Sequence, residues 1–186
     1  MIPFIILGGL VLVVLVVIWL LYNGLIRAKN IVSEGFSGID VNLKKRFELI
    51  PNLIEAVKGY NAHEAEVLQE IVAQRSSRGR SVMETASTDG SITGALKNFR
   101  IQVENYPDLK ANTQFIKLMD NLSQVENELA LSRRYYNGTV RDYNTKIQVF
   151  PGVLVANMMK FKAEEFYEIE NNNERSAPVV DLKEES

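Results

Sequence analysis

The stretch FIILGGLVLVVLVVIWLLY, from Phe4 to Tyr22, decides the fold because it runs for 19 residues without a charge. A helix of that length rises about 28 Å, close to the thickness of the hydrocarbon core of a bilayer. Trp19 and Tyr22 stand at its C-terminal end, where amphipathic rings prefer the headgroup region. We therefore predict a transmembrane anchor in residues 1–23, with Phe4, Trp19 and Tyr22 among the residues that hold it in the membrane.

A secretory signal peptide is the alternative interpretation of this stretch. It would have a basic leader, a shorter apolar core and a small-residue cleavage site, whereas the chain begins Met1-Ile2-Pro3 and leaves the stretch as Tyr22-Asn23-Gly24. We favour an uncleaved anchor. Arg27 and Lys29 follow the span, so the positive-inside tendency predicts a single-pass protein of the cytoplasmic membrane with its N-terminus outside and its bundle in the cytoplasm.

The remaining chain, roughly 160 residues, is long enough for one domain with a sizeable core and too short for two. All charges lie in this part, 21 basic against 23 acidic. This near balance gives no field that would recruit nucleic acid. Cysteine is absent, which excludes disulfides, thiol catalysis and thiolate metal sites.

Apolar residues recur at helical spacing directly after the span. One stripe continues the anchor to about residue 60 and comprises Val32, Phe36, Ile39, Leu43, Phe47, Ile50, Ile54 and Val57. A second, at residues 113–149, has a spacing near 3.5, typical of bundle or coiled-coil packing, and is broken only at Ser132. Its members are Phe115, Leu118, Leu122, Val125, Leu129, Tyr136, Val140, Tyr143 and Ile147. With no alternating strand pattern, we predict an all-α fold in which a single transmembrane helix continues into a long-helix antiparallel bundle over residues 24–170.

The shorter elements carry weaker patterns. A second helix is predicted to start near Asn61 to Glu64 and to end at about Ser77 or Gly79. Residues 79–91, GRSVMETASTDGS, are rich in turn-forming residues and are predicted to form a mobile connection. A shorter helix follows, with Ile92, Leu96, Phe99 and Val103 on one side. Asn112 or Thr113 can cap the next helix. Residues 171–186 are polar and acidic, and we predict a disordered tail.

Helix lengths place the segment after Phe150. If residues 24–60 lead away from the membrane and residues 113–149 return antiparallel, each over about 55 Å, then Phe150 arrives near the bilayer surface. The following residues are apolar and include two lysines, the composition of a helix that lies in the headgroup plane. The predicted membrane-surface residues are Val153, Leu154, Met158 and Phe161. The alternative is that this segment caps the open end of the bundle.

The sequence contains no phosphate-binding loop and no G-x-G-x-x-G motif. His63-Glu64 does not continue as H-E-x-x-H, because Val67 stands where the second histidine is needed. The repeated carboxylates match solvated helix faces. We therefore predict no catalytic residue, no cofactor and no metal ligand, and a protein that is not an enzyme.

Three tyrosines on the second long stripe are candidates for a partner surface. Tyr135, Tyr136 and Tyr143 lie in the half of that helix nearer the membrane, and aromatic side chains are enriched at protein interfaces. The alternative is that these tyrosines pack between helices and form hydrogen bonds there.

Several sequence blocks together resemble the LemA family. They are Ile39-Asp40-Val41, Leu43-Lys44-Lys45-Arg46, Leu49-Ile50-Pro51-Asn52-Leu53, Val57-Lys58-Gly59-Tyr60, Tyr106-Pro107-Asp108-Leu109-Lys110-Ala111-Asn112, Arg133-Arg134-Tyr135-Tyr136-Asn137, Tyr143-Asn144 and Phe150-Pro151. The resemblance extends from the anchor to about Tyr167. It implies a single-pass bacterial membrane protein with a helical bundle and no assigned enzymatic activity. It also implies relatives associated with membrane compartments in magnetosome-building bacteria, and some that accompany a membrane metalloprotease.

Two hypotheses about function follow. The first is a membrane-anchored scaffold that forms a homo-oligomer, with the membrane itself as a partner. The second is an adaptor or regulator of another membrane protein, such as a quality-control metalloprotease.

Overall fold

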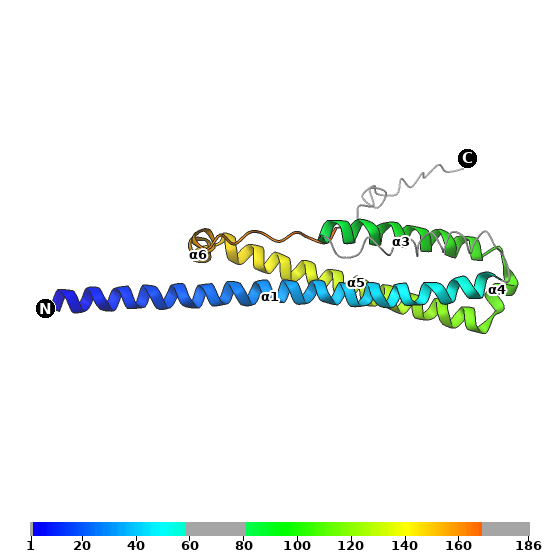
Figure 1. Ribbon diagram of the computed structural model, residues 1–186, viewed down its shortest axis with the longest axis horizontal. Coiled ribbons are helices and arrows are strands. Elements are labelled where there is room, and N and C mark those ends of the chain that lie inside the picture. Colours follow the sequence, from blue (N-terminus) through cyan, green and yellow to red (C-terminus); the bar gives the residue numbers. More distant parts are fainter. Residues whose placement is uncertain (1, 59–80, 169–186) are drawn as a thin grey trace, which may run out of the picture.

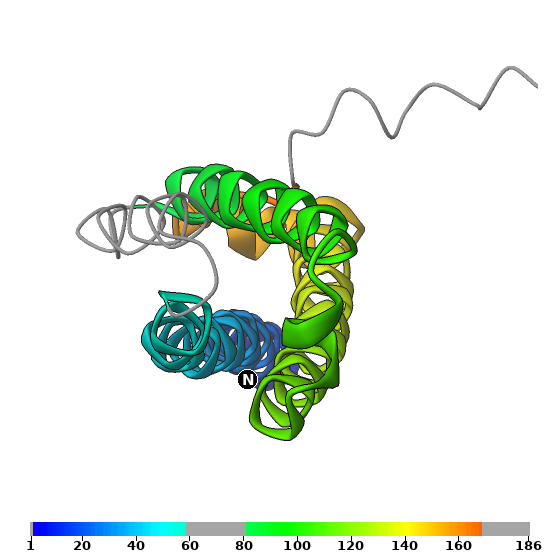
Figure 2. The ribbon, with the colours of Figure 1, turned by 90° about the vertical axis from the view of Figure 1, so that its right-hand side faces the viewer.

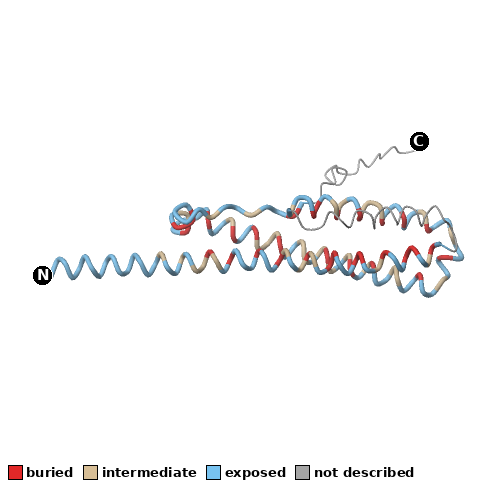
Figure 3. The backbone as a smooth tube through the Cα atoms, in the orientation of Figure 1, coloured by how far each residue is buried: buried red, intermediate tan, exposed pale blue. Residues whose placement is uncertain are grey.

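The computed structural model describes residues 2–58 and 81–168, and its first helix joins the apolar stretch to the bundle. Helix α1, Ile2–Lys58, is a single helix of 57 residues, about 85 Å long. Within the described residues it is the one helix that is long and apolar enough to cross a membrane. Its N-terminal part projects beyond the other helices with its side chains exposed (Figure 1, Figure 3). The predicted continuation of the apolar stretch into the bundle is confirmed.

Helix α5, Thr113–Gln148, runs antiparallel along α1 (Figure 1). Asn112 is its N-cap, and the side-chain oxygen of Asn112 accepts hydrogen bonds from the backbone N–H groups of Gln114 and Phe115 at 2.9 and 3.2 Å. Ser132, the break in its apolar stripe, accepts a 2.8 Å hydrogen bond from the amide of Asn42 on α1. The polar residue is therefore paired where the two helices meet, as buried polar groups require.

Helix α3, Val82–Val103, corrects one prediction. Residues 82–91, predicted as a mobile connection, form the first half of this helix. Ser81 is the N-cap, and its hydroxyl accepts a 3.1 Å hydrogen bond from the N–H of Glu84. The small residues in this segment favour a connection. The inward-facing side of the first half of α3 includes the polar residues Thr85 and Asp89, both buried. A polar inward face leaves no apolar period to detect.

The bundle end far from the apolar stretch is closed by α4, Pro107–Ala111, a short helix that begins with proline and connects α3 to α5. A distal apolar cluster fills this end and includes Phe47, Ile50, Leu53, Phe99, Phe115 and Leu122. Viewed along the bundle axis, α1, α5 and α3 surround this core (Figure 2). The long stripes predicted on α1 and α5 supply most of the buried positions, so their prediction is confirmed.

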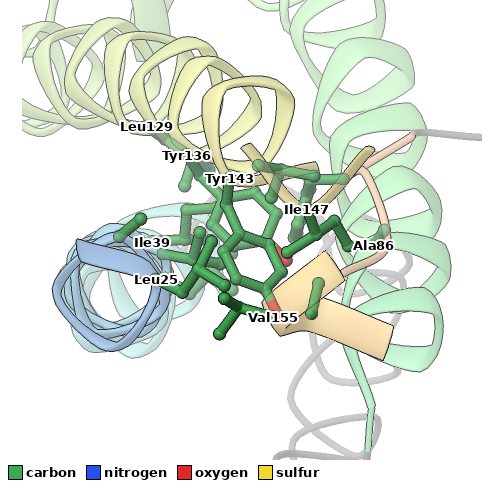
Figure 4. Packing of buried hydrophobic residues seen from close by; sticks show 14 residues of the cluster. Leu25, Ile39, Ala86, Leu129, Tyr136, Tyr143, Ile147 and Val155 are labelled. Atoms are coloured by element: carbon green, nitrogen blue, oxygen red, sulfur yellow. The ribbon is translucent and has the colours of Figure 1, made fainter. Parts of the chain in front are cut away.

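The other end of the bundle contains a second cluster and a short helix. Helix α6, Gly152–Met158, follows a cis peptide bond between Phe150 and Pro151. Figure 1 shows α6 nearly end-on, so its axis runs across that of α1. The proximal apolar cluster lies between α1, α5 and α6 and includes Leu25, Ile39, Leu129, Tyr136, Tyr143 and Val155 (Figure 4).

The described residues contain helices and no strand, which confirms the all-α prediction. The predicted helix from Glu64 to Ser77, the histidine at position 63 and the predicted disordered tail at 171–186 lie outside the described residues.

Candidate functional site

Residues 161–168, which we call the terminal strap, follow α6 and run back along α5 (Figure 1). The amide nitrogen of Asn144 donates to the carbonyl of Glu164, and the N–H of Glu164 donates to the amide oxygen of Asn144, both at 2.9 Å. Asn137 and Tyr167 exchange the same two hydrogen bonds at 3.1 and 2.8 Å. Each asparagine side chain thus pairs with the backbone N–H and C=O groups of one strap residue, as a residue of a neighbouring β-strand would.

The spacing of these contacts explains why an extended chain fits a helix here. Asn137 and Asn144 are seven residues apart, which is about 10.5 Å along a helix and nearly two full turns, so both face the same side. Their partners Glu164 and Tyr167 are three residues apart, which is about 10 Å in an extended chain. The two repeats match, and the strap runs antiparallel to α5.

Two tyrosines form a second row of contacts with the same spacing. The hydroxyl of Tyr136 donates to the carbonyl of Glu165 at 2.8 Å, and that of Tyr143 donates to the carbonyl of Lys162 at 2.9 Å. Both rings are buried in the proximal apolar cluster (Figure 4). These two members of the predicted partner surface therefore take the alternative role of packing between helices. Tyr135 differs, because its side chain is 54% exposed.

Burial also changes the acidity of these hydroxyls. Desolvation, with the nearby carboxylates of Glu164 and Glu165, raises the pKa of Tyr136 to about 12. Desolvation, followed by the charge of Glu164, raises the pKa of Tyr143 as well. Both hydroxyls therefore stay protonated at physiological pH and remain able to donate to the strap.

A buried ionic centre lies where α1, α3 and α5 meet. The guanidinium of Arg46 and the carboxylate of Asp89 are both fully buried, and Arg46 Nη2 lies 2.6 Å from Asp89 Oδ1. Arg46 Nη1 also donates to Thr93 at 3.1 Å and to Glu126 at 3.2 Å. Arg133 pairs with the other oxygen of Asp89. Two arginines thus face two carboxylates, which balances the charge of the centre.

The terminal strap ends in this ionic centre. The hydroxyl of Tyr167 donates a 2.8 Å hydrogen bond to Asp89 Oδ2, and the guanidinium of Arg133 lies 5.8 Å from the centre of the Tyr167 ring. Desolvation, with the charge of Asp89, raises the pKa of Tyr167. The strap therefore joins α3 to α5 through a buried charge as well as through backbone hydrogen bonds.

The buried ionic centre leaves no recognisable pattern in the sequence. Asp89 lay in the segment predicted to be a connection, and its partners Arg46 and Arg133 are more than forty residues away in the chain. The two asparagines that bind the strap did leave a pattern in the sequence, because the pairs Tyr136-Asn137 and Tyr143-Asn144 repeat at an interval of seven residues. Residues seven apart lie on nearly the same face of a helix, so this repeat indicates one row of tyrosine and asparagine side chains.

The end of the bundle beside the apolar stretch, formed by residues 149–161, divides into an inner and an outer face. Val155 and Ala156 of α6 are buried against α1 and α5, so α6 does cap the bundle. Gly152 allows this close fit, since a Cβ atom there would lie 2.2 Å from the carbonyl oxygen of Lys146. The capping alternative therefore describes the inner face.

The outer face holds the predicted membrane-surface residues. Leu154 is 61% exposed and Met158 is 57% exposed, whereas Val153 is half-buried. Phe161, also half-buried, packs edge-on against Tyr22 with 6.0 Å between ring centres. The structure brings these residues beside the end of the apolar stretch. Of the predicted anchor residues, Phe4 and Trp19 are 78% and 63% exposed and Tyr22 is 37% exposed.

The residues that the structure describes include no group of three or more histidine, cysteine, aspartate or glutamate side chains that could hold a metal ion. The buried polar groups instead bind one another and the strap. Chemically, this arrangement holds an extended segment in place and joins three helices.

The fold and these contacts define a class of protein. It is an all-α bundle whose first helix is long and apolar enough to cross a membrane and whose helices α3 and α5 are joined by the terminal strap. A family model for the LemA family matches residues 35–182. The chain therefore belongs to the LemA family.

Curated relatives agree with this assignment. The chain is 33% identical to Protein LemA of Metamycoplasma hominis over 134 residues, which cover 69% of this chain and 60% of the relative. It is also 29% identical to the magnetosome proteins MamQ 1 and MamQ 2 of Paramagnetospirillum magneticum over 80 residues, 43% of this chain and 29% of each relative. The chain thus spans less than two thirds of the length of these relatives.

Proposed function

We propose that this chain is a non-enzymatic scaffold of the bacterial cytoplasmic membrane, anchored by the N-terminal part of α1, and that copies assemble side by side. The observation that carries the proposal is the continuity of α1 from Ile2 to Lys58. Because α5 packs along the soluble part of α1, the anchor and bundle form one stiff rod. A rod of this kind suits a structural role at a membrane.

The orientation follows from charge. Arg27 and Lys29 follow the apolar stretch closely, whereas Met1, Ile2 and Pro3 carry no charged side chain. The positive-inside tendency therefore supports a bundle in the cytoplasm. The magnetosome names of two relatives also support a role at membranes.

A surface for contact between copies lies on α5. Leu131 and Tyr135 are 57% and 54% exposed and are four residues apart, so they lie on the same face of the helix. Tyr135 flanks the close approach of α1 and α5, since a Cβ atom at Gly35 would lie 3.5 Å from its ring and 3.3 Å from Tyr136 Cα. Two large exposed side chains on one helix face can pack against the same patch of a second copy.

The test is the mass of full-length protein extracted in mild detergent, measured by light scattering after size exclusion. We expect one homogeneous species heavier than a monomer. The double variant Leu131→Glu with Tyr135→Glu should reduce that mass to the monomer, because it places charges in the contact. Met83→Glu is the matched control, since Met83 is 66% exposed but lies on α3.

Mass spectrometry on the same peak distinguishes the scaffold from an adaptor. A monomeric protein at micromolar concentration in lipid would contradict the scaffold. A small species that carries a second membrane protein, such as a metalloprotease, would favour the adaptor. Crosslinking in cells that yields contacts between copies and none with other proteins would exclude the adaptor.

A further inference from the structure

We propose that the outer face at the membrane-proximal end of the bundle is a docking surface for anionic lipid headgroups. We call it the lipid-facing patch and define it by Val149, Phe150, Leu154, Met158 and Met159. The proposal rests on the anchoring part of the proposed function and does not depend on self-assembly. It is based on the exposed apolar side chains of the patch, its position beside the apolar stretch, the orientation of α6 and the basic residues nearby.

The patch is apolar and uncovered. Phe150 is 79% exposed, Leu154 is 61% exposed and Met158 is 57% exposed. Leu154 and Met158 are four residues apart, so α6 presents them on one side, and Phe150 is exposed just before the helix. Val155 and Ala156 are buried on the other side. The short helix is therefore amphipathic in the sense needed for binding at an interface, with one face committed to the bundle and one without a partner.

The patch lies at the depth where the apolar stretch ends. Ile18 and Leu21 of α1 pack against the cluster that contains Val155 and Ala156 of α6. Tyr22, the last residue of the apolar stretch, contacts Phe161 just after α6. A span that occupies the hydrocarbon core up to Tyr22 thus carries α6 to the headgroup boundary. Continuity with the span identifies the bilayer as the occupant.

The orientation of α6 also fits a bilayer as the occupant of the patch. Its axis runs across the axis of α1 (Figure 1), so a span that crosses the bilayer leaves α6 close to the membrane plane. An amphipathic helix in this plane buries its apolar face roughly 5–10 Å into the headgroup and acyl boundary. Ile18 and Tyr22 are four residues apart, about 6 Å along the helix, which places α6 within that depth.

The basic residues around the patch favour lipids with anionic headgroups. Arg27, Lys146, Lys160 and Lys162 are exposed near the patch, and none of them forms an ion pair within residues 2–58 and 81–168. Nearby basic residues attract anionic headgroups at a membrane surface. Lys29, by contrast, is engaged with Glu164 of the strap at 3.3 Å.

The absence of cysteine makes a site-directed test direct. Leu154→Cys provides one labelling site in the full-length chain, for an environment-sensitive fluorophore, and Ile101→Cys is the matched control. Both positions carry exposed apolar residues, 61% and 62%, but Ile101 lies near the far end of α3. Each protein is reconstituted in vesicles of phosphatidylcholine with and without phosphatidylglycerol, containing lipids spin-labelled near the headgroup.

We expect quenching of the probe at position 154, stronger with phosphatidylglycerol, and none at position 101. No quenching at 154 would overturn the proposal. Equal quenching in both lipids would overturn the choice of anionic headgroups. A probe that is shielded from water but unquenched, and that responds to protein density, would replace the bilayer with a second copy as the occupant.

The fluorescence of Trp19 distinguishes a failure of the docking surface from a failure of the proposed membrane anchor. It is the sole tryptophan and lies in the apolar stretch, so quenching of its own fluorescence reports insertion of the span in the same sample. Quenched Trp19 with an unquenched probe at 154 would overturn the docking surface alone. Unquenched Trp19 would overturn the anchor, and the docking surface with it.

Discussion

Asn144 and Glu164, twenty residues apart in the chain, exchange two hydrogen bonds of 2.9 Å between one side chain and one backbone unit. The same exchange joins Asn137 to Tyr167. A helix cannot pair its own backbone with a strand, because its N–H and C=O groups are already used within the helix. The two asparagines supply the missing donors and acceptors, so α5 holds an extended segment by its side chains.

Replacing Asn144 should loosen the terminal strap. Asn144→Ala removes a donor and an acceptor from the backbone of Glu164, and we expect the free energy of unfolding to fall by about 1–3 kcal/mol. Chemical denaturation measures this loss, and hydrogen exchange at the N–H of Glu164 should quicken. Asn121→Ala, at an exposed position of the same helix, should leave stability unchanged or slightly higher because alanine favours helices. Equal effects of the two variants would contradict the role of Asn144.

Neutralising Asp89 should be far more costly than neutralising a surface carboxylate. Asp89→Asn keeps the shape of the side chain but leaves two arginines facing Glu126 alone, and we expect a loss of about 3–5 kcal/mol in unfolding free energy. Glu128→Gln breaks the exposed pair with Lys45 and should cost less than about 1 kcal/mol. Denaturation curves of the two variants provide the comparison, and a small loss for Asp89→Asn would show that the centre is solvated.

Two glycines should respond to alanine in opposite directions. At Gly152 the new Cβ atom would meet the carbonyl oxygen of Lys146, so we expect Gly152→Ala to destabilise the protein by about 1–3 kcal/mol. At Gly138, inside α5, nothing lies within 4 Å of the Cβ position, and alanine should stabilise by up to about 1 kcal/mol. Thermal unfolding followed by circular dichroism would reveal the two signs, and a neutral Gly152→Ala would mean that α6 shifts without cost.

The hydroxyl of Tyr136 should make stability depend on alkaline pH. Its pKa is raised to about 12 in the folded protein, against roughly 10 in an unfolded chain. Its contribution is therefore complete below pH 10 and is lost as the pH rises towards 12, at up to about 1.4 kcal/mol per pH unit.

Tyr136→Phe provides the reference for this titration because it lacks the hydroxyl. The wild type should be more stable than the variant near pH 9, and its advantage should shrink as the pH approaches 12. Denaturation at a series of pH values measures the difference, which a constant value would contradict. Tyrosinate absorbance should also show one late-titrating group fewer in the variant.

The long helices were predictable because their burial follows a period. Leu43, Phe47 and Ile50 on α1, like Leu122, Val125 and Leu129 on α5, recur at helical spacing and lie in the core. Apolar surface is removed from water whatever its partner, so a local pattern suffices. The helix lengths separately predicted that the chain after Phe150 returns to the level of the apolar stretch, and Phe161 does contact Tyr22.

The start of α3 and the ionic centre required information that no local pattern holds. Asp89 is buried because Arg46 and Arg133 arrive from other helices, and a carboxylate is rarely buried without such partners. Its neighbours Ser87, Thr88 and Gly90 are turn-forming types. Specific pairing of charges therefore decided both the helix boundary and the centre, against the local composition.

The junction between the apolar stretch and the bundle has no hinge, because α1 passes through it as one helix. In a bilayer, the soluble part of α1 would extend about 54 Å beyond Tyr22. Membrane-spanning helices tilt by about 20° on average and adjust that angle to bilayer thickness. Such a tilt would carry the far end of α1 sideways by about 18 Å. The protein would then act as a lever arm that converts the thickness of the membrane into a lateral position tens of ångströms away.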